Sequence, residues 1–235
     1  MTRPPLCRPF PSRPLTVSSL LVVAMLWALS ANTSINFQRY FGGLPPAAAA
    51  TIACALGIAS LFVLQKRFGF CVIGTDTVTR GSLTAAAAAL PFMAAVTSVD
   101  LLLGFPADIH VELPAALVFY PLMGLIAQLA LHIAPFTLLL WAFSQMFGAW
   151  PLRRRIWLAI ILSASVESAF QLSGSAGPGD GSALLSAFVA THLLAFGLTE
   201  LYLFCRFDFV TMVIFRLTYY GYWHIFWGNL IQSSS

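Results

Sequence analysis

The chain has 235 residues, of which 59% are hydrophobic and 9% are charged, with a formal net charge of +4 and a mean hydropathy of +0.86. An ordinary soluble domain has about 25% charged residues, and its apolar core needs a polar surface to cover it. This composition therefore excludes a soluble globular protein. The basic residues form short clusters between apolar stretches, without interleaved aromatics, which excludes a nucleic-acid partner. We predict an all-α, polytopic transmembrane helix bundle embedded in the lipid bilayer.

A short N-terminal arm at residues 1–14 precedes a single predicted transmembrane domain, 15–235. Each crossing needs about 20 mostly apolar residues, and the domain offers about eight such spans: 15–31, 47–64, 83–103, 114–133, 136–150, 156–172, 182–204 and 209–231. The first stretch could alternatively be a cleaved signal peptide. The fourth and fifth share one stretch, which Pro135 interrupts because a proline inside a helix removes a hydrogen bond. If these two cross only once, with a re-entrant piece, seven spans remain.

The basic residues also predict the orientation of the bundle, because cytoplasmic loops carry an excess of Lys and Arg. Two clusters place the N-terminus and the loop after the second span in the cytoplasm: Arg3, Arg8 and Arg13, then Lys66, Arg67 and Arg80. The loop after the third span has Asp108 and Glu112 but no Lys or Arg, as an outer loop does. Eight alternating spans would put the cluster 153–155 outside. Either the fourth and fifth stretches cross once, or this cluster breaks the rule.

Ionisable residues inside a span cost about 2.5 to 3.5 kcal/mol each on insertion, so they are candidates for function. They concentrate late in the chain, at Glu167, His192, Glu200, Arg216 and His224. The earlier spans offer only Asp100 and His132, both near predicted segment ends. With a rise of about 1.5 Å per helical residue, Glu167, His192 and His224 fall in the same half of the bilayer. Packed helices can then bring these three side chains together.

One carboxylate and two imidazoles in a half-buried cavity are the groups that hydrolysis inside a membrane needs. The carboxylate and one imidazole can polarise a water, while the second imidazole donates to the oxyanion of a tetrahedral intermediate. Simpler interpretations stand beside this one. A single intramembrane His is often a hydrogen-bond partner between helices, and Glu167 could form a structural ion pair with Arg216. Glu200, close to a helix end, is interpreted as interfacial.

The region of about 156–231 resembles the CPBP group of intramembrane proteases, which contains the prenyl-protein (CAAX) endopeptidases and bacteriocin-processing enzymes. That family carries the motifs EExxxR, FxxxH and HxxxN or HxxxD on successive late helices. The second motif is complete here, as Phe188-Val-Ala-Thr-His192. The third begins at His224 but has Gly228 at its last position, with Asn229 one residue later. The first keeps Glu167, followed by Ser168 and further on Gln171, and so lacks the second Glu and the Arg.

The resemblance implies an intramembrane endopeptidase that hydrolyses a peptide bond in a membrane-associated protein or peptide substrate. It implies that Glu167 and His192 activate water and that His224 binds the oxyanion. The supporting residues would be Phe188, Gln171, Arg216 and Asn229. Members are often labelled metalloproteases, and the Glu/His/His set could hold zinc, but a general base needs no metal, so the cofactor stays open. The implied location is the bacterial inner (plasma) membrane.

Two alternatives of other classes remain from the residues alone. One is a non-catalytic relative that binds or stabilises another membrane protein through the same cavity. The other is a small proton-coupled transporter, in which the intramembrane Glu and His residues relay protons. Carriers of that kind commonly have inverted halves with broken helices in matching positions. The interruption at Pro135 has no counterpart, which disfavours the transporter.

Overall fold

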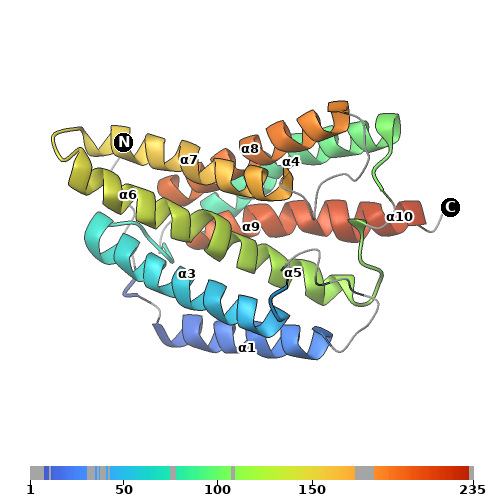
Figure 1. Ribbon diagram of the computed structural model, residues 1–235, viewed down its shortest axis with the longest axis horizontal. Coiled ribbons are helices and arrows are strands. Elements are labelled where there is room, and N and C mark those ends of the chain that lie inside the picture. Colours follow the sequence, from blue (N-terminus) through green and yellow to red (C-terminus); the bar gives the residue numbers. More distant parts are fainter. Residues whose placement is uncertain are drawn as a thin grey trace.

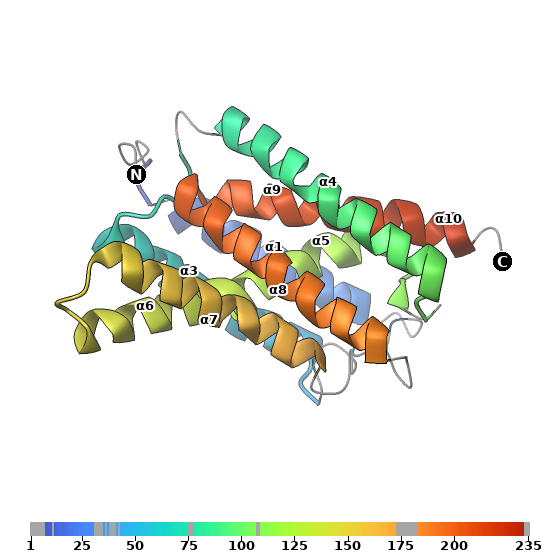
Figure 2. The same ribbon diagram turned by 90° about the horizontal axis from the view of Figure 1, so that it is seen from above.

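The computed structural model describes residues 8–10, 12–30, 35, 37, 41, 43–74, 78–106, 109–172 and 183–232. Within them the chain is helical and has no extended strand, which confirms the all-α prediction. The helical segments of the described residues join into seven rods, which pack side by side (Figure 1 and Figure 2). They are α1 (Ser12–Ser30), α3 (Pro46–Phe68), α4 (Val78–Leu103), α5 (Ala116–Ala127) with η2 (Gln128–Ile133) and α6 (Ala134–Met146), α7 (Leu152–Leu172), α8 (Ala183–Arg206), and α9 (Phe209–Tyr220) with η3 (Gly221–Trp227) and α10 (Gly228–Gln232).

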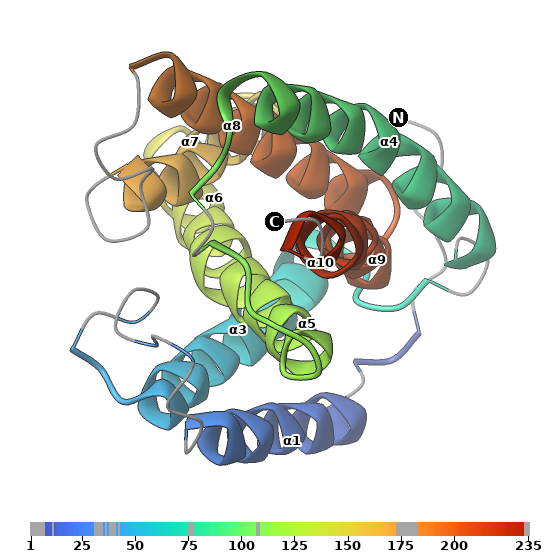
Figure 3. The ribbon, with the colours of Figure 1, turned by 90° about the vertical axis from the view of Figure 1, so that its right-hand side faces the viewer.

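Six of these rods are long and apolar enough to cross a bilayer. Their outward faces carry large apolar side chains, such as Trp27, Leu83 and Leu102, which are 71%, 70% and 80% exposed. Lipid is the solvent that can cover such faces, so the chain is a membrane protein with transmembrane helices. The count of about eight spans is not confirmed. The seventh rod, α9–η3–α10, is not among the six, and it packs between α4, α5 and α8 near the middle of the bundle (Figure 3).

The structure corrects the expected break at Pro135, because residues 116–146 form one rod of 31 residues. The backbone widens into a π-helix over Gln128–Ile133, and the N–H of Ala134 donates to the carbonyl of Leu129, five residues back. Pro135 lies in the first turn of α6. Its missing N–H is tolerated there because the turn before it no longer follows the α-helical pattern. The fourth and fifth predicted stretches are therefore one helix.

The π-helix is held in place by a close contact with α3. Gly57 of α3 has no side chain where it meets η2, and a Cβ at this position would lie 2.5 Å from Cδ2 of Leu129. Leu129 can therefore pack directly on the α3 backbone, inside the larger apolar core. This contact fixes the rotation of η2 about its axis. It thereby fixes the direction in which the polar residues of η2 point.

Among the described residues, the basic residues at the ends of four helices lie at one end of the bundle. Lys66 and Arg67 close α3, Arg80 lies in the first turn of α4, the cluster 153–155 begins α7, and Arg206 closes α8. Backbone hydrogen bonds tie this end together. Arg8 N donates to Ile73 O over 3.2 Å, and Phe209 N donates to Cys71 O over 3.2 Å. The conflict over residues 153–155 thus disappears, and we expect this end to face the cytoplasm.

Reporter fusions after Arg80, Glu112 and Ala149 test this topology. We expect the fusions after Arg80 and Ala149 to report the cytoplasm and the fusion after Glu112 to report the opposite side, because one helix joins residues 116–146. Eight spans would put Ala149 on the side of Glu112. Cys71 is disulfide-bonded, and disulfides are rare in the cytoplasm. A reporter after Arg80 on the outer side would agree with that bond and overturn the orientation.

Candidate functional site

The centre of the bundle holds a buried ionic cluster around Arg216 of α9, whose side chain is 1% exposed. The guanidinium binds Glu167 of α7 in a bidentate pair, with Nη1 3.0 Å from Oε1 and Nη2 2.7 Å from Oε2. It also binds Glu200 of α8, with Nε 2.8 Å from Oε1 and Nη2 2.7 Å from Oε2. Two parallel N–H···O bonds to each carboxylate are the strongest arrangement that an Arg can make. The single cation thus joins three helices.

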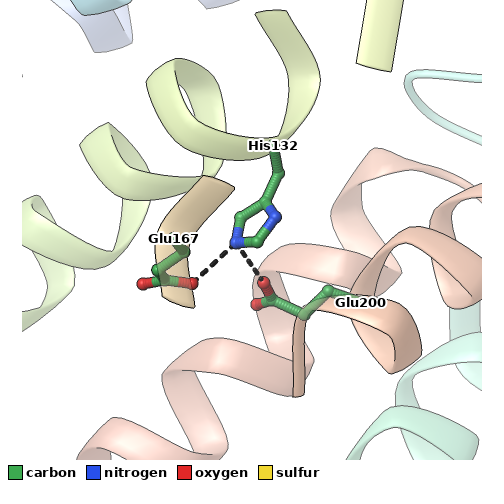
Figure 4. Close-up of side chains that lie close together, drawn as sticks. All are labelled: His132, Glu167 and Glu200. Atoms are coloured by element: carbon green, nitrogen blue, oxygen red, sulfur yellow. Dashed lines mark hydrogen bonds and ion pairs between the residues drawn. The ribbon is translucent and has the colours of Figure 1, made fainter. Parts of the chain in front are cut away.

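The π-helix η2 completes the cluster with His132 and Gln128. His132 Nε2 lies 2.7 Å from Oε2 of Glu167 and 3.3 Å from Oε2 of Glu200 (Figure 4). The Gln128 amide donates to Glu200 Oε1 over 3.1 Å and to the Met212 carbonyl over 2.8 Å. Gly197 of α8 makes room for the imidazole, since a Cβ there would lie 2.9 Å from Cε1 of His132. The wide turn and the glycine together direct the ring at both carboxylates.

The hydrogen bonds of His132 constrain where its proton lies. Nε2 is within reach of Glu167 Oε2 and also of Arg216 Nη2, at 2.9 Å. An Arg can only donate, and an ionised carboxylate can only accept. A proton on Nε2 lets the ring donate to the carboxylates that it faces. The contact between Nε2 and Nη2 of Arg216 is then not a hydrogen bond, because both nitrogens are donors. Counting both carboxylates as ionised and the imidazole as neutral, the formal charge of the cluster is −1.

His132, Glu167 and Glu200 are also the described residues whose donor atoms are close enough to share a metal ion, with all of these atoms within 4.8 Å. The predicted zinc set was different and shares only Glu167 with this group. Nη2 of Arg216 lies 2.7 Å from each carboxylate and 2.9 Å from His132 Nε2. The guanidinium thus occupies the point where a cation would bind these three donors. The cluster therefore does not fit zinc.

Beside the cluster lies a cavity of about 320 Å³, lined by α3, α4, α5, η2, α7, α8, α9, η3 and the loop after α4. Its walls are mostly apolar and aromatic. Glu167, His192 and His224 all contribute to its lining, together with Gln171 and Tyr220. Within the ionic cluster, Glu167 is the member that also lines the cavity, while His132, Glu200 and Arg216 lie behind it. The structure therefore brings the three predicted catalytic residues to one space.

His192 is oriented by neighbours from three helices. Its Nε2 lies 3.0 Å from the hydroxyl oxygen of Tyr219 on α9. The Phe188 ring, one turn earlier on α8, has its centroid 5.1 Å from the imidazole, and the Phe92 ring of α4 meets it edge-on at 5.4 Å. The FxxxH spacing thus places the aromatic ring against the His, as expected from positions i and i+4 of a helix. His192 faces the cavity with a fixed ring plane.

His224 lies in the π-helix η3 and stacks on Tyr120 of α5, with ring centroids 4.2 Å apart and planes at 10°. Its Nδ1 is 3.4 Å from Nδ1 of His110, in the loop after α4. Asn229, predicted to support His224, instead donates from Nδ2 to the carbonyl of Ile225 in its own helix, over 2.7 Å. Its amide is thus used within the helix, and no hydrogen bond joins it to His224 among the described residues.

Three members of the cluster, Gln128, His132 and Glu200, were not predicted as site residues. Glu200, interpreted as interfacial, is 0% exposed, and His132 lies inside the rod 116–146 and not near a segment end. His132 was placed near a segment end because the helix was expected to break at Pro135. Glu200 could have been found by its match to Arg216, because one guanidinium in a span can pair two carboxylates. The structural ion pair between Glu167 and Arg216, considered as an alternative, is present.

No protein-family profile, curated protein or solved structure matches this chain. The resemblance to the CPBP group therefore rests on the residues of this sequence alone.

Proposed function

We propose that the chain is an intramembrane endopeptidase of the bacterial inner membrane, which hydrolyses a peptide bond in a membrane-associated substrate bound in the cavity. The observation that supports the proposal most is that Glu167, His192 and His224, from three different rods, line one largely apolar cavity. Apolar walls suit a segment that arrives from lipid. The three side chains that would activate water and stabilise the oxyanion lie on the same walls.

The ion pair with Arg216 favours different roles for Glu167 and His192 in the proposed reaction. Both oxygens of Glu167 already accept hydrogen bonds from Arg216, which stabilises the ionised carboxylate and makes it a weak base. Its remaining lone pairs can still orient a water. His192 is the better base, because donation from Nε2–H to the oxygen of Tyr219 leaves a lone pair on Nδ1. In this arrangement Glu167 positions the water and His192 takes its proton.

The reaction then needs two steps. In the first, the water oxygen bonds to the substrate carbonyl carbon, His192 accepts the proton, and the oxyanion is stabilised by an N–H of His224. In the second, the tetrahedral intermediate collapses and the C–N bond breaks. The amine leaves with the proton that His192 returns. Tyr219 holds the imidazole in place throughout, as the third group does in hydrolases that use an oriented base.

The Glu167→Gln variant separates an enzyme from a scaffold. The neutral amide keeps the shape of the side chain and leaves Arg216 paired with Glu200, so the protein should fold. It binds water less well, and cleavage should fall by about 100-fold. Substrates can be found by comparing the membrane proteins of cells with and without the chain, searching for shortened products. Ser165→Ala is the matched control, since that hydroxyl donates only to the Ile161 carbonyl in its own helix.

A non-catalytic scaffold would give a different result. The level of its partner would follow the abundance of this chain, would be unchanged in Glu167→Gln, and no shortened product would form. Full function of Glu167→Gln at normal expression would therefore reject the hydrolase and leave the binding role.

The ionic cluster favours one further function, proton-coupled transport. Ionisable side chains inside a membrane bundle are typical of proton pathways, and here His132 lies between the carboxylates of Glu167 and Glu200. Proteoliposomes test this directly. Proton uptake that depends on a solute and is abolished by His132→Gln would support a carrier, whereas a hydrolase should carry no such flux.

A further inference from the structure

The loop after α4 is fixed across the end of the cavity that lies nearest η3. Gly104 ends α4 with a φ of 70°, a left-handed conformation that favours glycine. Asp100, in the last turn of α4, binds both the loop and η3 through its carboxylate. Its Oδ1 accepts from the backbone N–H of Phe105 over 2.9 Å, and its Oδ2 accepts from Nε1–H of Trp227 over 2.8 Å. The loop is thereby joined to η3.

Tyr120 of α5 clamps the part of the loop that contains His110. Its hydroxyl oxygen accepts from the backbone N–H of Val111 over 2.7 Å, and its O–H donates to the carbonyl of Ile109 over 3.2 Å. These two residues flank His110 in the chain. The backbone of His110 is therefore held from both sides by one side chain, and that same side chain stacks on the His224 ring.

Gly228 provides the space that the His110 ring occupies. A Cβ at Gly228 would lie 2.6 Å from both Cγ and Nδ1 of His110, closer than real Cβ atoms approach. The backbone of the last rod is thus in direct contact with the imidazole. Any side chain at position 228 would displace it.

In the resulting His110–His224 pair, one ring nitrogen of each imidazole faces the other. The two Nδ1 atoms are 3.4 Å apart, with ring centroids at 5.4 Å and planes at 66°. Burial lowers the pKa of His110 to about 4, so this ring is neutral near pH 7 and carries one N–H and one lone pair. Two neutral imidazoles facing each other through Nδ1 can be joined only if one donates and the other accepts.

We propose that His110 is a positioning residue that donates from Nδ1–H to Nδ1 of His224 and thereby places the His224 proton on Nε2. His224 then presents an N–H donor that does not depend on its being charged. The consequence for turnover rests on the proposed function, in which His224 stabilises the oxyanion. The geometry of the pair does not depend on that function, so the hydrogen bond between the imidazoles and its effect on turnover can be tested separately.

The direct test is the ring ¹⁵N spectrum of the full-length protein in detergent, labelled at its four histidines and assigned by single substitutions. We expect wild-type His224 to carry its proton on Nε2, with Nδ1 as a hydrogen-bond acceptor. A nitrogen that accepts a hydrogen bond has a changed ¹⁵N chemical shift, which we call the acceptor shift. His110→Leu should abolish the acceptor shift of His224 Nδ1. Gly228→Ala should do the same, although His110 is still present, because the added methyl displaces its ring. Gly221→Ala is the matched control, since a Cβ there meets nothing within 4 Å, and should leave the spectrum unchanged.

The proposal is overturned if wild-type His224 carries its proton on Nδ1, or if Gly228→Ala leaves its spectrum as in the wild type. His110→Gln distinguishes positioning from packing, because its amide can also donate to Nδ1 and should restore the acceptor shift that Leu abolishes. In a cleavage assay, His110→Leu should lower kcat about tenfold with little change in KM. A chain without any cleavage would reject the proposed function and leave the spectral test intact. Normal kcat in His110→Leu, with the spectral change present, would overturn the positioning role in turnover.

Discussion

Replacing Arg216 with leucine should destabilise the protein by about 3 to 5 kcal/mol, the cost of removing one partner from a buried ion pair. Arg216 is the cation that Glu167 and Glu200 share inside the bundle. Without it two carboxylates are left facing each other, away from water. We expect a strong loss of folded, monodisperse protein in detergent and a large drop in its unfolding midpoint. The stability of Arg216→Lys should lie between those of the wild type and Arg216→Leu, because a Lys keeps the charge but cannot make the bidentate pairs.

Arg206→Leu is the control for this prediction, since Arg206 is exposed at the end of α8 and should contribute less than about 1 kcal/mol. A triple variant tests whether the stranded carboxylates cause the loss of stability. Adding Glu167→Gln and Glu200→Gln to Arg216→Leu removes the stranded charges and should recover much of the lost stability. If Arg216→Leu is as stable as Arg206→Leu, or if the triple variant is no better than the single one, the ionic cluster is not what stabilises the packing of α7, α8 and α9.

Replacing His192 with alanine should lower cleavage of a physiological substrate by about 100- to 10,000-fold, the range that a general base contributes. The loss should fall on kcat, because the imidazole acts on the attacking water and not on the apolar part of the substrate. Adding Glu167→Gln should cost little more, since both groups act on one water. Tyr219→Phe removes the hydroxyl that orients the ring, and we expect a smaller loss, of about tenfold.

Thr191→Ala is the control for His192. This neighbour is exposed on the same helix, and its hydroxyl donates only to the carbonyls of Ala187 and Phe188. It should retain full activity and stability. Normal cleavage by folded His192→Ala would reject the assigned base. Equal losses in Thr191→Ala and His192→Ala would mean that this stretch of α8 is sensitive to substitution for structural reasons.

The sequence by itself was sufficient to identify a helical membrane protein, because hydrophobicity is a sum over residues and does not depend on which helices are neighbours. It also identified the candidates Glu167, His192, Arg216 and His224, since an ionisable side chain is conspicuous in an apolar segment. The residues of the FxxxH motif lie together for a local reason as well, as they are one helical turn apart.

Which of these groups pair with one another was decided only by the tertiary structure. A pairing depends on the rotation and crossing of each helix, and small packing features set both. The π-turn before Pro135 keeps one rod continuous and turns His132 inward. Gly197 admits the His132 ring, and Gly228 admits His110 from a loop more than 100 residues earlier. No spacing in the sequence reports such contacts, because the atoms that meet are brought together by the packing of the whole bundle.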